Sequence, residues 1–375
     1  MAFEIGSLPF HVGYMDNPRN PDKLPSTLDF CFDQDADSGL VHQVVSDRVA
    51  SALNSVYSLG NEIGTPLDTE GAGLPYLEDF RDFVVAGTRR DARLLEIGVG
   101  RGHLTHLLGR SGRDITGIEP GQGYSNEWKR LGIRVVQDFF PSSSIEGKFD
   151  GVVAYAVLEH VAQPIDFLES IRDILEPAGK VFLAVPDCSA EISFGDPSMF
   201  IHEHVSYFTA ETLLSVSRRA GFDATVIQSG YGRSLYLQGT IATPSPIRHS
   251  SEDSPLPGPH LSGRFFEKVD NVRKALKLFG REGPVGVFCP GRALPFLEKG
   301  ANYRFFDDDV RLWGKFLPPF EFPIEGRSAL FEDPVHNLLV CSRTFGDQIA
   351  DELVASGFRG RIHKSYGENF DVVAI

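Results

Sequence analysis

The sequence has few cysteines, no long apolar run and too few basic residues to balance its acidic ones. Its four cysteines are scattered along 375 residues without a CxxC pair, at Cys31, Cys188, Cys289 and Cys341. Such spacing argues against a zinc knuckle and against a disulfide framework. Because the longest apolar runs are too short to cross a bilayer and the N-terminal residues lack the pattern of a secretory signal, we expect a cytoplasmic protein without membrane contact.

The excess of acidic residues restricts the partners of the protein. The formal net charge is −15, whereas proteins that bind DNA or RNA along its backbone present a basic surface. We therefore expect no nucleic acid partner. A small anionic substrate that is held by a few local arginines is compatible with this charge.

Local patterns divide the chain into four parts. Residues 1–75 are rich in Pro, Asp, Asn and Ser, and their clearest periodicity predicts an amphipathic helix over 40–59, so we interpret them as a cap or a substrate lid. Helices and strands then alternate over 76–243, which predicts an α/β unit with seven mostly parallel strands and an antiparallel hairpin at one edge. A Pro/Ser-rich linker follows over 244–261. A second α/β pattern over 262–375 predicts a small Rossmann-like domain.

The most informative local motif is Arg93–Gly102, RLLEIGVGRG. An apolar run ends in Glu96, and the glycines that follow are Gly98, Gly100 and Gly102. Glycines at the end of a buried strand allow a tight turn and a close approach of a ligand. The motif lacks the GK[ST] of a phosphate-binding loop, and its GxGxG spacing differs from GxGxxG. A carboxylate at this strand end suits the amino-acid and ribose parts of S-adenosyl-L-methionine (SAM).

Three further strand ends carry groups that suit the same ligand. Glu119-Pro120 closes the second strand, 21 positions after Gly98, where an acid accepts hydrogen bonds from ribose hydroxyls. Asp138-Phe139 closes the third strand, so that the acid can accept from an adenine amino group while the ring stacks. The candidates after the fourth strand are Ala156, Leu158 and His160. NAD is the alternative ligand, and the loop spacing with Asp138 favours SAM.

A second motif, FIHEHVSYF over 200–208, offers groups for proton transfer. His202 and His204 are two positions apart, so they cannot act as the zinc ligands of HExxH, and we expect no metal site. In an extended loop both rings would point the same way, and Glu203 could orient one of them. A histidine that titrates near neutral pH is the usual proton carrier. The alternative is a packing pair with Glu203 in a salt bridge.

These motifs together resemble a class I SAM-dependent methyltransferase over about residues 80–242. The resemblance is carried by LEIGVGRG, IEP, QDFF and YAVLEHVAQPIDFLESIRDILEPAGKVFLAVPD. It implies a sheet whose seventh strand is antiparallel, as the predicted hairpin also suggests. It implies SAM as the cofactor and a small molecule as the methyl acceptor.

The segment HEHVSYFTAETL is similar to one in the sugar C-methyltransferases, which act on nucleotide-linked 4-keto-deoxysugars. That family has an N-terminal zinc lobe, a central methyltransferase and a C-terminal Rossmann-like domain. The resemblance implies that a base removes a proton next to a ketone, and that the enolate carbon then attacks the SAM methyl. It implies His204 as the base with Glu203 as its partner, His202 near the substrate or the enolate oxygen, and Tyr57 as an active-site tyrosine.

The chain departs from that family at two places. Ile201 stands where the family has a tyrosine before HEH, and the N-terminal part has no cysteine pairs, so the structural zinc is expected to be absent. Two other functions are therefore kept open. One is O- or N-methylation of a natural-product scaffold, and the other is a divergent SAM-binding subunit of an assembly.

Overall fold

The structure is a computed structural model that describes residues 3–11, 13–19, 24–59, 73–243, 261–343, 345–366 and 371–373. Contacts group the described chain into two units. The first draws its described residues from Phe32–Ser189 and Glu203–Leu256, and the second from Phe3–Cys31, Ala190–His202 and Pro257–Ile375. The predicted lobe over 1–75 is thus divided between the units. Of the predicted linker, residues 244–260 lie outside the described residues.

The first unit is built on a seven-stranded mixed sheet, as predicted. Its strand order is β10-β11-β8-β7-β4-β5-β6, and only β11 runs antiparallel to its neighbours. The strands are β4 (Arg93–Ile97), β5 (Asp114–Ile118), β6 (Val135–Val136), β7 (Phe149–Tyr155), β8 (Leu175–Pro186), β10 (Phe222–Gln228) and β11 (Ser234–Ile241). The predicted edge hairpin is the pair β10 and β11.

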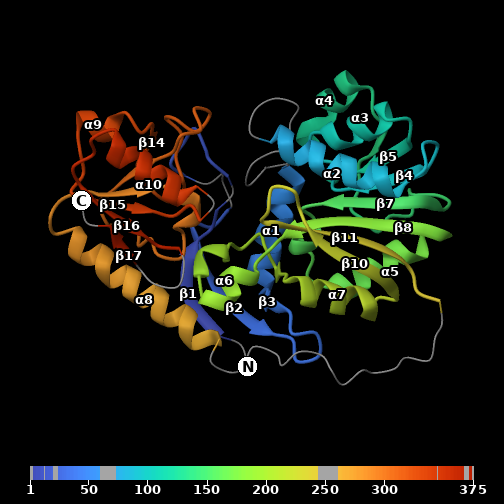
Figure 1. The fold of residues 1–375 in the computed structure, drawn as a ribbon, viewed down its shortest axis with the longest axis horizontal. Coiled ribbons are helices and arrows are strands. Elements are labelled where there is room, and N and C mark those ends of the chain that lie inside the picture. The colour runs from blue at the N-terminus through green and yellow to red at the C-terminus, as the bar shows by residue number, and fades with distance from the viewer. Residues whose placement is uncertain are drawn as a thin grey trace. The chain divides into compact units, whose positions relative to one another are not determined.

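Helices cover both faces of this sheet (Figure 1). One face holds α2 (Leu74–Gly87), α3 (His103–Arg110) and α4 (Ser125–Leu131), and the other holds α5 (Pro164–Asp173) and α7 (Ala210–Arg219). Successive side chains along β4 point to opposite faces of the sheet, which explains this layering. Leu94 joins the core under α2 and α3, while Leu95 and Ile97 join the core under α5 and α7. Burial of each leucine contributes about 2 kcal/mol, which holds β4 between two apolar layers.

Two predicted helices are wrong in part. Val41–Gln43 is a strand, β3, and the helix α1 begins only at Asp47 and ends at Leu59. β3 pairs with residues 32–34 of β2 (Thr27–Gln34) and with β9 (Ser206–Tyr207), and Val41 and Gln43 are both buried. The run VHQVV is rich in β-branched residues, so its strand preference outweighed the apparent helical spacing.

The second error concerns the end of α5. The run PIDFLESIRDILEPAG predicts a helix that Pro177 and Gly179 terminate, whereas α5 ends at Asp173 and both residues lie in β8. The register between β7 and β8 shifts at Phe149 to Gly151, so this part of β8 is irregular. A Cβ on Gly179 would lie 2.9 Å from two backbone oxygens. The backbone therefore approaches too closely here for a residue with a side chain, which explains why the residue is glycine.

The second unit contains a six-stranded sheet of order β14-β13-β12-β15-β16-β17, in which only β17 is antiparallel. The strands are β12 (Val285–Phe288), β13 (Tyr303–Phe306), β14 (Ile324–Glu325), β15 (Asn337–Val340), β16 (Arg361–Lys364) and β17 (Asp371–Val373). The helix α10 (Gly346–Ala355) packs against Leu338 and Val340, and α8 (Leu261–Phe279) buries Val272 and stacks Phe279 on His363. β1 (Phe3–Pro9) lies beside β2.

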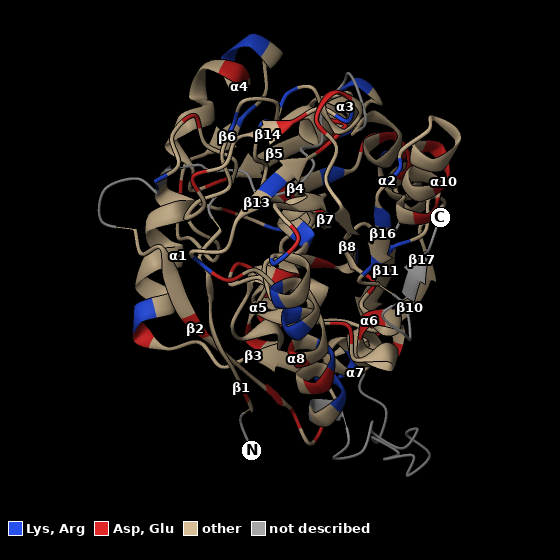
Figure 2. Cartoon of the chain, turned by 90° about the vertical axis from the view of Figure 1, so that its left-hand side faces the viewer, with Lys and Arg blue, Asp and Glu red and all other residues tan. Residues whose placement is uncertain are grey.

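Acidic and basic side chains are interspersed along α8 rather than segregated (Figure 2). Asp270 and Lys274 form an ion pair one turn apart on this helix. Among the helices in the described ranges, none is both long and apolar enough to cross a membrane.

Candidate functional site

The glycine-rich turn after β4 shows three glycines with different tasks. All have positive φ, at 75° for Gly98, 52° for Gly100 and 92° for Gly102. A Cβ on Gly98 would lie 2.4 Å from Val157, and one on Gly102 would lie 2.2 Å from Ile133. At Gly100 no heavy atom of the described structure lies within 4 Å of that position. Gly98 and Gly102 therefore serve packing, whereas Gly100 leaves its side of the turn open to a ligand.

Glu119 holds this turn from the end of β5. Its carboxylate accepts hydrogen bonds from the Gly100 N–H at 3.0 Å and from the Gly121 N–H at 2.8 Å. The indole of Trp128 donates to the Gly100 carbonyl at 2.8 Å. The turn is thus fixed from two neighbouring elements, with a carboxylate at the place predicted for a ribose-binding acid.

Glu96 lies beneath the turn rather than on it. Its side chain is 2% exposed and accepts a hydrogen bond of 2.5 Å from the Thr105 hydroxyl. Burial raises the pKa of Glu96 to about 8, and the charge of Glu119 adds to this shift. Glu96 therefore ties α3 to β4 from inside the fold, which differs from the predicted direct contact with a ligand.

A hollow of about 610 Å³ opens at the residues that follow β5 and β6. It is lined by Ser58, Pro120, Gln122, Gln137, Asp138 and Phe139. Hydrogen bonds from the Ser142 hydroxyl at 2.6 Å and from the Phe139 N–H at 2.8 Å orient the Asp138 carboxylate and hold its pKa below the usual range. The Phe139 ring is 49% exposed, so it offers a face on which a planar group can stack.

The segment after β7 adds the next group of side chains. Ala156 is exposed and adopts φ of 53°, a strained conformation for alanine that is typical of functional turns. Leu158 begins the short 3-10 turn η2 (Leu158–His160), and its side chain is buried in the core under α5 and α7. Leu158 therefore anchors the turn. Its buried side chain does not have the predicted role of binding a ligand.

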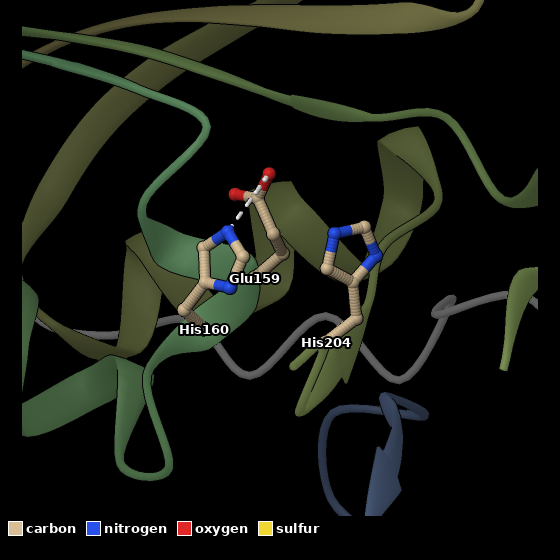
Figure 3. Close-up of side chains that lie close together, drawn as sticks. All are labelled: Glu159, His160 and His204. Atoms are coloured by element: carbon tan, nitrogen blue, oxygen red, sulfur yellow. Dashed lines mark ion pairs between the residues drawn. The ribbon is translucent and has the colours of Figure 1, made fainter. Parts of the chain in front are cut away.

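His160 is the centre of a cluster that joins three segments of the first unit. Its Nδ1 donates to the Glu203 carbonyl at 2.9 Å and lies 3.4 Å from the Tyr57 hydroxyl of α1. Its Nε2 lies 3.9 Å from Oε1 of Glu159, and its ring centroid is 5.0 Å from that of His204. Figure 3 shows Glu159 and His160 pointing toward each other with His204 beside them.

Burial governs the charges in this cluster. It raises the pKa of Glu159 to about 8 and that of Glu203 to about 8, the latter with a contribution from the charge of Glu159. It lowers the pKa of His160 to about 4. Burial and the two nearby carboxyl groups also raise the pKa of the Tyr57 hydroxyl. At neutral pH the cluster thus holds a neutral imidazole and carboxyl groups that are largely protonated.

His202 does not belong to this cluster, contrary to its predicted place near the substrate. Its ring is 2% exposed, and Nε2 donates to the Leu28 carbonyl at 3.1 Å. The rings of Phe10 and Phe30 contact it edge-on, with centroids 5.5 and 5.4 Å away. Burial lowers its pKa to about 4. These contacts indicate a packing role.

Some functional groups were missed or misplaced by sequence reasoning. His160 is predicted on the cofactor side, whereas its contacts are with Tyr57 and Glu203. The sequence does not single out Glu159 at all. The available signal is the adjacency of two ionisable residues in a turn directly after a buried strand, where ligands bind in open parallel sheets. Ser58, Gln122 and Gln137 carry no such signal.

Comparison with known families finds a match over the central part of the chain. The sequence model described as a methyltransferase domain matches residues 73–227. Residues 73–227 are therefore similar to methyltransferase domains. The match includes the glycine turn, Glu119, the 610 Å³ hollow apart from Ser58, and the HEH segment. S-adenosyl-L-methionine is the expected cofactor of the domain.

The chain is similar to curated proteins over part of its own length and part of theirs. It is 28% identical over 160 residues to the ubiquinone biosynthesis O-methyltransferase of Roseobacter denitrificans, covering 38% of this chain and 64% of that protein. It is 31% identical over 161 residues to the protein of the same name from Xanthomonas oryzae pv. oryzae, covering 39% and 62%. The chain thus spans a little over three fifths of the length of these relatives.

A solved structure also overlaps with the chain. The 1,6-didemethyltoxoflavin-N1-methyltransferase of Burkholderia thailandensis, solved with S-adenosylhomocysteine, covers 56% of this chain and is itself covered to 99%. The sequence identity is 17% and the TM-score is 0.42.

Proposed function

We propose that the protein transfers a methyl group from S-adenosyl-L-methionine to a carbon next to a ketone in a small acceptor, with His204 as the base. One observation carries this proposal. Tyr57, His160, Glu203 and His204, from three separate segments, converge at the carboxyl end of β7. The turn that carries His160 touches the glycine turn, since Val157 fills the space beside Gly98. Proton-transfer groups therefore adjoin the expected cofactor site.

The residues around the hollow fit the cofactor. The open side of Gly100 admits a closely approaching group, and Glu119 supplies a carboxylate for ribose hydroxyls. Asp138 and the exposed ring of Phe139 suit an adenine. When bound, SAM supplies an electrophilic methyl group. The protein has to supply a carbon nucleophile and hold the acceptor in place.

Deprotonation next to a ketone leaves negative charge on the ketone oxygen, and the cluster offers donors for it. The Tyr57 hydroxyl keeps its proton because its pKa is raised. Glu203 has a pKa of about 8, so its carboxyl group is largely protonated at neutral pH and can donate as well. One well-placed donor contributes about 3 kcal/mol to stabilising such an oxyanion. His204, half-buried beside His160, then takes the proton from carbon.

The acceptor we propose is a nucleotide-linked keto-deoxysugar or a related natural-product intermediate, by resemblance of the HEH segment to sugar C-methyltransferases. The second candidate function is O-methylation or N-methylation. It is favoured by two observations: the curated relatives are O-methyltransferases, and Ile201 replaces the tyrosine of the sugar enzymes. In that case His204 would deprotonate a hydroxyl or an amine.

Solvent-deuterium exchange separates the two candidates. A keto-deoxysugar incubated with the protein in D₂O without SAM should take up deuterium next to its ketone, because only C-methylation requires an enolate. Uptake would be followed by mass spectrometry, with the His204→Ala protein as the control. Methyl transfer to the same acceptor without any exchange at carbon would contradict C-methylation and favour transfer to oxygen or nitrogen.

Phe139→Ala tests the stacking role. We expect the dissociation constant of SAM to rise about 5-fold, since stacking on an aromatic ring contributes about 1 kcal/mol. Little stability should be lost because the ring is 49% exposed. Isothermal titration calorimetry measures the binding, and Ile227→Ala is the matched control, since Ile227 is 51% exposed and lies on β10. Equal affinity of the two variants would place the adenine elsewhere.

A further inference from the structure

Glu159, His160 and His204 form a group of metal-ligand type that the proposed methyl transfer does not require. One possible ligand atom from each lies within 4.8 Å of the others (Figure 3). Two come from the turn after β7 and one from the segment that precedes β9, so the fold rather than the sequence spacing brings them together. The HEH motif alone predicted no metal site, because its histidines are only two positions apart.

We infer that Glu159, His160 and His204 bind a divalent transition-metal ion, with two imidazole nitrogens and one carboxylate oxygen as ligands. Zn²⁺ accepts this donor set and keeps a further position for a water or an acceptor oxygen. Co²⁺ and Fe²⁺ accept it as well, whereas Mg²⁺ and Ca²⁺ prefer oxygen ligands.

The orientation of His160 supports this assignment. A metal-bound histidine almost always donates its second ring N–H to a carbonyl or a carboxylate, which fixes the ring and its tautomer. His160 already has this arrangement, because Nδ1 donates to the Glu203 carbonyl at 2.9 Å. Its Nε2 faces Oε1 of Glu159 at 3.9 Å.

Glu159 provides the second, independent observation. Its side chain is 1% exposed, and within the described structure its Oε2 has no hydrogen-bond partner. A buried carboxyl oxygen without a partner is costly, and a cation held by both oxygens of this carboxylate would offset that cost. A bound metal ion would thus explain why an acid occupies this buried position, which packing alone does not explain.

The distances require only small side-chain movements. Ligands about 2.1 Å from a tetrahedral ion lie about 3.4 Å from one another. Here Nε2 of His160 lies 3.9 Å from Oε1 of Glu159, and the three ligand atoms all lie within 4.8 Å of one another. Glu159, which is buried, and His160, which is half-buried, are nearly in place. His204 is half-buried, so rotation of its side chain can close the remaining gap.

One consequence rests on the proposed function. A nitrogen lone pair of His204 that holds a metal ion cannot also take a proton from the acceptor. We therefore expect Zn²⁺ to inhibit methyl transfer, and a chelator to restore it.

Zn²⁺ titration of the full-length protein, stripped with EDTA and dialysed, tests the site by calorimetry. We expect one equivalent to bind, and His204→Asn to weaken binding at least about 10-fold, since even loss of a residue that only orients a ligand costs that much. His336→Asn is the matched control, because it removes an exposed histidine of the second unit. Visible absorption of bound Co²⁺ reports the ligand geometry independently of activity.

The assignment is overturned if His204→Asn and Glu159→Gln both bind Zn²⁺ as the unaltered protein does. Thermal melts of each variant show whether it is folded, and His204→Asn is the safer one because its side chain is only half-buried. Zn²⁺ that binds in one equivalent and activates methyl transfer would uphold the site and reject His204 as the base. Failure of the chain to bind SAM would reject the proposed function and leave the Zn²⁺ titration unaffected.

Discussion

His204→Ala is expected to lower kcat by about 10²-fold or more while SAM still binds with unchanged affinity. Proton transfer by a positioned side chain contributes about 10²–10⁴-fold to a rate. His204 lies beside His160, at a ring distance of 5.0 Å, and is not among the residues that line the 610 Å³ hollow. Its removal should therefore affect the chemical step alone. Steady-state kinetics and calorimetry with SAM would measure the two quantities.

His336→Ala serves as the control for removal of an imidazole, since His336 is exposed and lies in the second unit. A kcat within a few-fold of the unaltered protein for His204→Ala, with the deuterium exchange also preserved, would show that another group removes the proton. Glu203 would then be the next residue to test, because its carboxyl lies 3.9 Å from His160.

Local signals in the sequence predicted where the glycine turn and two acidic residues lie relative to the strands. The turn Gly98 to Gly102 follows β4 directly, so the sequence itself places these glycines at the carboxyl end of a buried strand. Glu119 and Asp138 follow β5 and β6 in the same way, and parallel neighbours bring their strand ends to one edge. These residues required no knowledge of long-range contacts beyond the strand order.

The cluster around His160 could not be predicted as completely, because it depends on contacts between distant segments. The rule that residues two apart in a strand face the same way placed His202 with His204. In the structure His202 packs on Phe10 and Phe30, which are more than a hundred positions earlier in the chain. The role of His160 likewise depends on the carbonyl of Glu203, 43 positions later. No local pattern encodes either partner.

The difference between local signals and long-range contacts also explains why the predicted helix over 40–59 is wrong at its start. Val41 and Gln43 are buried by pairing with Tyr207 and Phe32, so a strand forms in a run whose own spacing also fits a helix. Burial through long-range pairing outweighs a local periodicity of only a few residues.

Gly100→Ala should weaken SAM binding about 30-fold with only a modest loss of stability. Gly100 has φ of 52°, which costs an alanine about 1 kcal/mol, and its added methyl group would meet no atom of the described structure within 4 Å. The methyl group would instead occupy the open side of the turn, where a close ligand is expected. Overpacking at such a contact costs about 2 kcal/mol. Calorimetry with SAM and thermal melts would measure the two effects.

Gly132→Ala is the matched control for this experiment. Gly132 ends α4 with φ of 67°, and within the described residues nothing lies within 4 Å of its Cβ position either. The two substitutions therefore impose similar backbone strain, and they differ in whether a ligand approaches. Equal stability losses with weaker SAM binding only in Gly100→Ala would mean that the turn is open for the cofactor. Equal SAM affinity in both variants would contradict that role, because the methyl group would then fill space that no ligand uses.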